Sequence, residues 1–256
     1  MKIAVLSMCI GERYQKLWSS AINSKKIYCE KNSYDFIYID KSLDTNRKPH
    51  WSKIRGIQNN LNDYDWIFYS DADAHIMNFD VKLEDIISKY SNNNTFLIIT
   101  KDNCEINSGN FLIKNCSLSK DFLKDVYSEY PTKPVNIGKF TVNWNDQYGV
   151  YHTYTKSKYI NNIKFLKQRI INAYPCSCCG EKYQAGDFLI HFVNTARSTH
   201  NWAGDSEEPY KEIQLAEAKT QLYHMNNYIK QVNSKIQTLT KDNAKMKKMI
   251  EKLLRQ

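Results

Sequence analysis

The stretch of sequence that decides the fold reads Trp66-Ile67-Phe68-Tyr69-Ser70-Asp71-Ala72-Asp73-Ala74-His75. Its apolar start is typical of a buried strand, which leads directly into two carboxylates one residue apart. Because side chains i and i+2 of an extended backbone point to the same side, Asp71 and Asp73 are expected to lie together at the strand's carboxyl end. A hard divalent cation prefers oxygen ligands, would relieve their repulsion and could hold a diphosphate. Aspartate pairs are common in turns, but this D-x-D pattern at a strand end favours a metal site.

Outward from this strand, strand-like and helix-like patterns alternate over residues 1–200. Apolar runs predict strands at Ile3–Met8, Phe36–Ile39, Trp66–Tyr69, Phe96–Thr100, Phe111–Ile113 and Phe188–Phe192. Helical patterns cover Arg13–Lys31, Ser52–Leu61, Leu83–Tyr90, Ser119–Tyr130 and Asp146–Lys156. This alternation predicts an α/β fold with helices on both faces of a sheet, and ligands in such folds bind beyond the carboxyl ends of the strands.

The composition is that of a folded chain without a membrane span. Hydrophobic residues make up 42% of the 256 residues and aromatic residues 13%, which argues against disorder. No run of 18 apolar residues occurs, so no transmembrane helix is expected. The N-terminal strand is too short in its apolar run to be a signal peptide. These features predict a cytoplasmic protein.

Seven cysteines in a chain of this length do not indicate a disulfide framework. Cys176, Cys178 and Cys179 cluster, but a zinc site needs about four ligands and no fourth is evident. We therefore expect free thiols, no zinc and a reducing compartment.

Residues 211–256 differ from the rest of the chain and carry +6 of its net charge of +9. Apolar residues alternate there at spacings of three and four, which predicts a left-handed coiled coil. Isoleucine at several a positions and one polar residue, Asn243, favour two parallel strands. The alternative is one amphipathic helix folded back onto the body, although such a helix usually has a broader apolar stripe. The heptad a positions are Leu215, Leu222, Ile229, Ile236, Asn243 and Ile250, and the d positions are Ala218, Met225, Val232, Leu239, Met246 and Leu253.

Two segments of the body contain candidate ligand-binding residues beside the D-x-D pair. His191 ends an apolar strand and could supply a third metal ligand, although a lone histidine there is more often structural. Gly109 permits close approach of the backbone to a ligand, and Asn107 and Ser108 before it could bind sugar hydroxyls. A tight turn into a strand explains that segment equally well.

Charged residues near predicted helix starts form a second group of candidates. Lys53 follows Ser52, a potential helix cap, and could reach an anionic ligand. Asp146, followed by Gln147, is either a carboxylate favoured at a helix N-terminus or a group that faces the reacting sugar. Arg197 could hold a phosphate with its planar guanidinium or could be a surface residue.

Taken together, these blocks resemble the galactosyltransferase/xylosyltransferase/mannosyltransferase family of GT-A glycosyltransferases (glycosyltransferase family 34). The resemblance covers about residues 1–200 and is specific only as a whole. It implies a Rossmann-like GT-A fold, a UDP-sugar or similar donor, Mn²⁺ or Mg²⁺, and transfer to a glycan hydroxyl with retention of configuration. The matching text is Tyr34-Asp35-Phe36, Trp51-x-Lys53, Asp65-Trp66-Ile67-Phe68-Tyr69-x-Asp71-Ala72-Asp73-Ala74-x-Ile76-Met77-Asn78, Asn107-Ser108-Gly109-x-Phe111-Leu112-Ile113-Lys114-Asn115, Asp146-Gln147 and Gly186-Asp187-Phe188-x-x-His191-Phe192.

For the metal and the phosphates, the resemblance implies that Asp71, Asp73 and His191 are the protein ligands. The run His191-x-x-Asn194-x-x-Arg197 is similar to the H-x-x-G-x-x-K pattern of related retaining enzymes, with Asn and Arg in place of Gly and Lys. Arg197 is accordingly expected against the donor phosphates.

For the rest of the donor, the loop from Met8 to Arg13 matches the segment that meets uracil and ribose. Asn107–Gly109 matches the donor-sugar segment, and Lys53 is expected to bind the donor as well. Asp146 and Gln147 match the positions nearest the reacting carbon, which makes them the candidate catalytic residues.

Two features depart from the family's pattern. Eukaryotic members carry an N-terminal membrane anchor, whereas this chain begins at the first strand, which indicates a soluble variant or a shortened form. The coiled coil is the second departure, and it divides the chain into predicted domains 1–205 and 211–256. We expect it to form a homodimer, and its lysines could touch an anionic membrane surface.

Two other classes of function compete with this interpretation. A basic coiled-coil scaffold that binds nucleic acid would need a dense basic stretch ahead of the heptads, but residues 205–214 are acidic on balance. A metal-dependent nucleotidyl- or phosphotransferase would need a glycine-rich phosphate loop near the first strand, where Gly11-Glu12-Arg13 is a poor match. No nucleic-acid partner is expected.

Overall fold

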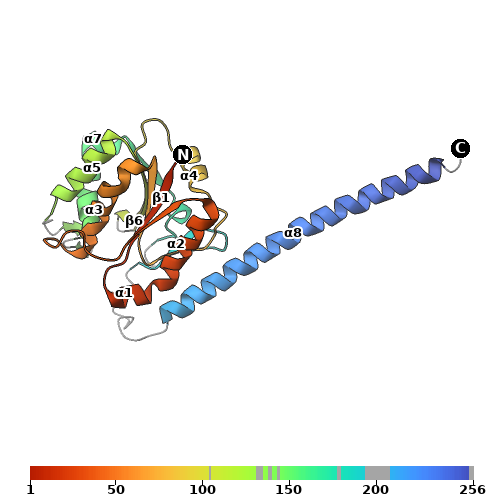
Figure 1. Ribbon diagram of the computed structural model, residues 1–256, viewed down its shortest axis with the longest axis horizontal. Helices are drawn as coiled ribbons and strands as arrows, with labels where there is room; N and C mark the ends of the chain where they lie inside the picture. The colour runs from red at the N-terminus through yellow and green to blue at the C-terminus, as the bar shows by residue number, and fades with distance from the viewer. Residues whose placement is uncertain are drawn as a thin grey trace.

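The computed structural model describes residues 1–103, 105–130, 135–137, 140–142, 145–177, 180–193 and 208–253. Within these residues an α/β body is followed by one long C-terminal helix (Figure 1).

A six-stranded sheet forms the centre of the body. Its order is β2 (Asp35–Ile39), β1 (Ile3–Met8), β3 (Trp66–Ser70), β6 (Glu105–Lys114), β5 (Leu97–Asp102) and β9 (Ile163–Leu166). β6 runs antiparallel to both of its neighbours, and the other pairs are parallel. The carboxyl ends of β1 and β3 therefore share one edge of the sheet, beside the amino-terminal half of β6.

Alternate side chains of each strand pack against helices on opposite faces of this sheet. Ile67 and Tyr69 of β3 share a core cluster with α3, α5 and α6, whereas Trp66 and Phe68 share another with α2 and α4. Figure 1 shows α3 and α5 on one side of the sheet and α2 and α4 on the other. The predicted α/β fold with helices on both faces is confirmed.

The helices of the described body are α1 (Glu12–Leu17), α2 (Ser19–Asn32), α3 (Ser52–Asn60), α4 (Leu83–Tyr90), α5 (Ser117–Ser128), α6 (Asp146–Tyr154) and α7 (Ser157–Ile160), with 3-10 turns η1 (Pro49–Trp51), η2 (Leu61–Asp63) and η3 (Gln168–Ile170).

Two short antiparallel sheets complete the strands, and they differ most from the sequence prediction. β4 (Ala74–Ile76) pairs with β10 (Leu189–His191), and β7 (Val135–Ile137) pairs with β8 (Phe140–Val142). The strand predicted at the end of the body is thus present as β10, but it lies outside the central sheet. β4, β7, β8 and β9 were not predicted. The single predicted helix from Arg13 is two helices, because the backbone of Trp18 leaves the helical conformation between them.

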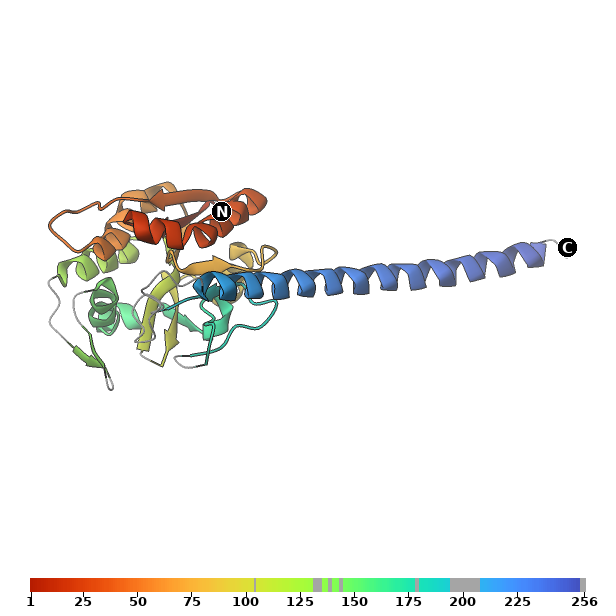
Figure 2. The ribbon, with the colours of Figure 1, turned by 90° about the horizontal axis from the view of Figure 1, so that it is seen from below.

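α8 (Glu208–Leu253) is one continuous helix of 46 residues that extends away from the body, as Figures 1 and 2 show. Apolar side chains on its predicted stripe lie open to solvent: Leu222 is 52% exposed, Ile229 47% and Ile236 53%. The helix agrees with the heptad pattern. The pairing of two such helices, and the division into domains 1–205 and 211–256, stay predictions.

The cysteines only partly agree with the expectation of free thiols. Cys9, Cys29 and Cys116 are free, but Cys176 is disulfide-bonded. Disulfides persist mainly in oxidising compartments, so this bond weighs against the reducing compartment that we expected. Among the described helices, none combines the length and the apolar character needed to cross a bilayer. The cytoplasmic location stays a prediction.

Candidate active site

The D-x-D segment forms a tight turn where β3 ends. The Ala74 amide donates to the Asp71 carbonyl (3.1 Å), and the Asp71 amide donates to the Gly109 carbonyl on β6 (2.7 Å). The explanation based on an extended strand is wrong, because β3 ends at Ser70 and the turn, not strand alternation, brings the two carboxylates together.

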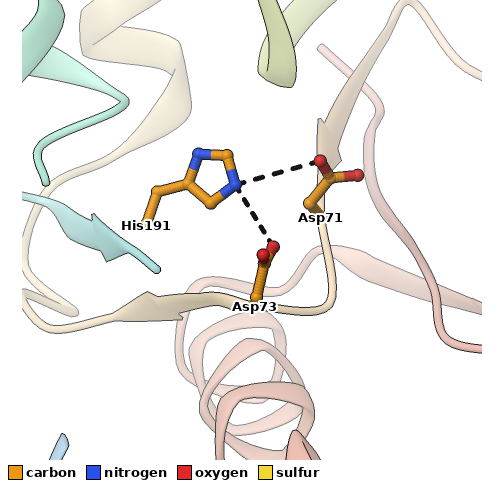
Figure 3. Close-up of side chains that lie close together, drawn as sticks. All are labelled: Asp71, Asp73 and His191. Carbon is orange, nitrogen blue, oxygen red and sulfur yellow. Dashed lines mark ion pairs between the residues drawn. The ribbon is translucent and has the colours of Figure 1, made fainter. Parts of the chain in front are cut away.

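His191 reaches this turn from a distant part of the sequence. β10 pairs with β4 so that His191 lies opposite Ala74, and its Nε2 is 3.2 Å from Asp73 Oδ1 and 3.9 Å from Asp71 Oδ2 (Figure 3). One ligand atom from each of these three residues lies within 4.8 Å of the others. Two carboxylates and an imidazole can coordinate a cation such as Mn²⁺, so the structure brings the three predicted metal ligands into a suitable cluster.

Gly109 leaves the room that this cluster needs. A Cβ atom at this position would lie 2.2 Å from His191 Cε1 and 2.9 Å from Asp71 Oδ2. Both distances are well below van der Waals contact, and packed interiors tolerate such overlap poorly. The sequence predicted that Gly109 permits close approach of the backbone to a ligand. In the structure, the groups that lie close to Gly109 are His191 and Asp71, two candidate metal ligands.

Lys53 on α3 connects the cluster to a third carboxylate. Its buried ammonium lies 3.2 Å from Asp71 Oδ1 and 2.8 Å from Asp146 Oδ2, and it donates to the Ser108 carbonyl (3.0 Å). Burial alone would lower the pKa of Lys53, but Asp146 and Asp71 outweigh burial and hold that pKa above its usual value. Lys53 is thus a charged group whose contacts are protein oxygens.

The charge balance of the cluster favours a bound cation. Burial raises the pKa of Asp71; Lys53 opposes the rise, and the neighbouring Asp73 adds to it. Among the described residues, these two carboxylates and Asp146 face two buried lysines: Lys53, which forms ion pairs with Asp71 and Asp146, and Lys25, which is attracted to Asp73 and Asp71. A divalent cation between Asp71 and Asp73 would favour the charged form of both carboxylates. The residues present therefore fit a divalent metal.

Asp146 and Gln147 open α6 next to β6. The side chain of Asn145 caps this helix by accepting from the Tyr148 amide (3.3 Å). Ser108 Oγ donates to Asp146 Oδ2 (3.3 Å), and the Ser108 amide donates to Gln147 Oε1 (3.4 Å). The two candidate catalytic residues therefore contact the segment expected to bind the donor sugar.

A cavity of about 290 Å³ lies over these groups. Asn107 lines this cavity, and its side-chain amide donates to Asp102 Oδ2 (3.0 Å) and to the Tyr174 hydroxyl (2.9 Å). The amide nitrogen of Asn107 is therefore bonded within the protein. The lining residues are Tyr14, His50, Lys53, Asp71, Asp73, Asn107, Ser108, Asn145, Asp146, Gln147, His191 and Val193.

Two further donor-binding candidates, Met8 and Arg13, lie outside this lining. Met8 ends β1, and Arg13 is exposed on α1, where its neighbour Tyr14 reaches the cavity instead. Arg197 falls outside the described residues. Tyr14 and His50 were missed because neither belongs to a recognisable motif.

Lys25 on α2 is a further residue that the sequence did not reveal. It is fully buried, and its ammonium donates to the Ala74 carbonyl and lies 3.5 Å from the Ala72 carbonyl. Burial lowers the pKa of Lys25 to about 7, against the opposing attraction of Asp73 and Asp71. It therefore supports the backbone of the D-x-D turn, but nothing in the sequence distinguishes it from an exposed helix lysine.

We expect Gly109→Ala to impair metal binding more than folding. The added methyl group would displace His191 and Asp71, and we estimate a loss of Mn²⁺ affinity of about 10–100-fold by analogy with groups that support metal ligands. Calorimetric Mn²⁺ titration and a thermal melt separate the two effects. Gly180→Ala is the matched control, because its Cβ would be equally crowded, 2.2 Å from Gln168 Oε1, but against Gln168 rather than against a candidate metal ligand. Equal Mn²⁺ affinity in both variants would contradict this role of Gly109.

The sheet order, the acidic turn after β3 and the histidine beside it define the class of the body as a GT-A glycosyltransferase fold. Among solved structures, a glycosyltransferase involved in the glycosylation of the major capsid of PBCV-1 has a similar fold, with a TM-score of 0.60 over 85% of this chain and 100% of that chain at 16% identity. The model of the galactosyl transferase GMA12/MNN10 family matches residues 3–97 and 87–200. The chain belongs to this family, which confirms the resemblance stated from the sequence.

The sequence identity between this chain and the two relatives described next is below 30%. An uncharacterized alpha-1,2-galactosyltransferase of Schizosaccharomyces pombe is 26% identical over 250 residues, which cover 76% of this chain and 65% of that protein. Xyloglucan 6-xylosyltransferase 4 of Arabidopsis thaliana is 28% identical over 113 residues, which cover 40% of this chain and 22% of that protein. The chain thus spans less than two thirds of the length of either relative.

Proposed function

We propose that this protein is a metal-dependent glycosyltransferase that moves a sugar from a nucleotide-sugar donor, most simply a UDP-sugar, to a hydroxyl group of a glycan. The observation that carries the proposal is the cluster of Asp71, Asp73 and His191 at the carboxyl edge of the sheet. Membership of the family and the names of the relatives, a galactosyltransferase and a xylosyltransferase, support the same reaction class.

In this proposal Asp71, Asp73 and His191 hold one Mn²⁺ or Mg²⁺ ion. When bound, the ion supplies positive charge that stabilises the departing nucleoside diphosphate. Arg197 is proposed to add a planar cationic contact to the same phosphates. Lys53 lines the cavity and is proposed to bridge Asp71 and Asp146 through its two ion pairs, and its contact with the donor stays a prediction.

Asp146 and Gln147 are proposed to face the reacting carbon. Their oxygens would stabilise the positive charge that develops on the sugar as the leaving group departs. Ser108 and Gly109 would lie along the donor sugar, since Ser108 contacts these oxygens and Gly109 lies against Asp71 and His191 of the metal cluster. Asn107, Met8 and the Arg13 loop would shape the remainder of the donor site. Retention of configuration is proposed on the resemblance to the family alone.

A thermal-shift screen of UDP- and GDP-sugars, each with and without Mn²⁺, tests this function. A ligand that binds the folded protein raises its melting temperature by mass action. We expect a shift with a UDP-sugar that requires Mn²⁺, followed by release of UDP when a glycan acceptor is added. Absence of any nucleotide-sugar effect, with a folded protein, would contradict the proposal. A phosphotransferase would instead be stabilised by a nucleoside triphosphate.

His191→Ala provides a sharper test of the metal cluster. If His191 is a ligand, its removal should lower Mn²⁺ affinity by at least the loss of about 10–100-fold that removal of a supporting group causes. His75→Ala is the control, because His75 is an equally buried histidine on the paired strand β4. It should lower the melting temperature with unchanged Mn²⁺ affinity. The same pattern in His191→Ala would return that residue to a purely structural role.

We also propose that α8 pairs with α8 of a second copy to form a parallel coiled-coil homodimer. The support is the exposed apolar stripe on a helix that extends away from the body. Contact of its outer lysines with an anionic membrane surface is a secondary proposal, which binding to vesicles with and without phosphatidylserine would test.

A further inference from the structure

Behind His191 lies a buried polar side chain that no motif revealed. Asn172 is fully buried, and its Oδ1 lies 2.7 Å from His191 Nδ1. It follows η3 and directly precedes Ala173, which bridges to Ile190 of β10. The contact is therefore made on the side of the imidazole that faces away from Asp71 and Asp73.

Asn172 is itself held by the central sheet. Its Oδ1 also accepts from Asn110 Nδ2 on β6 (2.8 Å), and its Nδ2 donates to Thr100 Oγ1 on β5 (3.0 Å). Asn110 in turn accepts from Ser70 Oγ on β3 (2.8 Å). Ser70, Thr100 and Asn110 have no exposed surface, so water does not compete for these hydrogen bonds.

With the Asn172 amide oriented by its bonds to Asn110 and Thr100, the arrangement favours one nitrogen of His191 as the site of the proton. A carbonyl oxygen can only accept, so the short contact to Asn172 Oδ1 requires a hydrogen on Nδ1. In a neutral imidazole the other nitrogen then has a free lone pair, and Nε2 is the atom that faces Asp73 and Asp71. A metal ion needs that lone pair, and groups that orient a metal-binding histidine in this way tune its affinity.

The network also joins the two sheets. His191 lies on β10, whose strand partner is β4 of the small sheet, whereas Asp71 follows β3 of the central sheet. Asn172 contacts side chains from β5 and β6 and so fixes the imidazole relative to the central sheet. We propose that Asn172 is a positioning residue that holds His191 as the Nδ1–H tautomer with Nε2 directed at the metal cluster. This inference rests on the proposed metal site.

The test uses the full chain and three variants. Asn172→Leu removes the acceptor, whereas Asn172→Asp keeps an oxygen in its place. Gln168→Leu is the matched control, because Gln168 is a buried amide in the same segment that bonds the Asn172 backbone and not His191. We expect about 10–100-fold weaker Mn²⁺ binding for Asn172→Leu, a change of a few fold at most for Asn172→Asp, and for Gln168→Leu a lower melting temperature only.

A second measurement does not depend on metal. The ¹⁵N resonances of His191 in metal-free protein, assigned with His191→Gln, report its tautomer directly. We expect Nδ1–H in the unaltered chain and a mixture of tautomers in Asn172→Leu. An Nε2–H tautomer in the unaltered chain would overturn the inference. In that case the oxygen and nitrogen atoms of the Asn172 and Asn110 side-chain amides would be exchanged relative to the structure. Unchanged tautomer and Mn²⁺ affinity in a folded Asn172→Leu would overturn it as well.

If Asn172→Leu does not fold, Thr100→Val removes one of the two side chains that orient the Asn172 amide and leaves Asn110 in place. It should shift the tautomer population in the same direction, and an unchanged population would overturn the inference. Failure of the proposed function is recognised separately. In that case the unaltered chain binds no Mn²⁺ although His191 is the Nδ1–H tautomer.

Discussion

Asp73→Ala should abolish metal-dependent donor binding and reduce sugar transfer by on the order of 10²–10³-fold or more, as expected for loss of a preorganised electrostatic group. Asp73 supplies one of two carboxylates in the cluster, and its Oδ1 lies 3.2 Å from His191 Nε2. Its side chain is about a quarter exposed and lies on a turn rather than in the core. We therefore expect a normal fold with the metal site removed.

The measurements are Mn²⁺ titration, a thermal melt and UDP release with an acceptor. Asp121→Ala is the control, because it removes an exposed carboxylate on α5 that pairs with Lys158 at 2.9 Å, away from the cavity. It should change neither metal affinity nor turnover. Turnover in Asp73→Ala that equals the control and keeps its metal dependence would refute the assignment of the cluster.

Much of the central sheet could be predicted because alternation is a local property. In Trp66–Tyr69 every second side chain faces the same helices, so the sequence specifies both the strand and its two buried faces. The pairing of β10 with β4 is different. The run around Ile190 reads as a strand wherever it lies, and its partner is determined by contacts between residues more than a hundred positions apart. The sequence therefore predicted a strand at His191 but not the small sheet that holds it.

The residues of the candidate site also divide into those that the sequence predicted and those that it did not. Asp71, Asp73 and His191 were found because carboxylates and an imidazole at strand ends have a recognisable chemistry, and the resemblance to the family joined them. Lys25 and Asn172 were not found, since a lysine on a helix and an asparagine in a loop look the same whether buried or exposed. Their roles depend on complete burial beside the cluster, which only the assembled fold provides.

In the proposed dimer, the exposed apolar stripe of α8 would be covered by the α8 stripe of a second copy. An isolated helix has marginal stability in water, and a continuous exposed apolar stripe marks an interaction surface. A second α8 presents the same stripe in the same register, with Asn243 opposite Asn243 where the two amides can bond. The pair of Asp242 with Lys247 of the other helix would be exposed and contribute little. Burial of the stripe, rather than charge, should therefore hold the dimer.

A single substitution in the middle of the stripe should consequently separate the two copies. Ile236→Lys would place a charge at an a position in each helix, where burial without a partner is costly, so we expect a monomer by light scattering. Gln237→Lys adds the same charge at the neighbouring outer position and should leave a dimer. Because the metal cluster and the cavity lie within residues 1–193, turnover per body on a soluble acceptor should be the same in both variants. A monomer for the unaltered chain, or a dimer for Ile236→Lys, would contradict the proposed coiled coil. A trimer for the unaltered chain would keep the coil and correct only the number of strands, since that number depends on which branched residues occupy a and d.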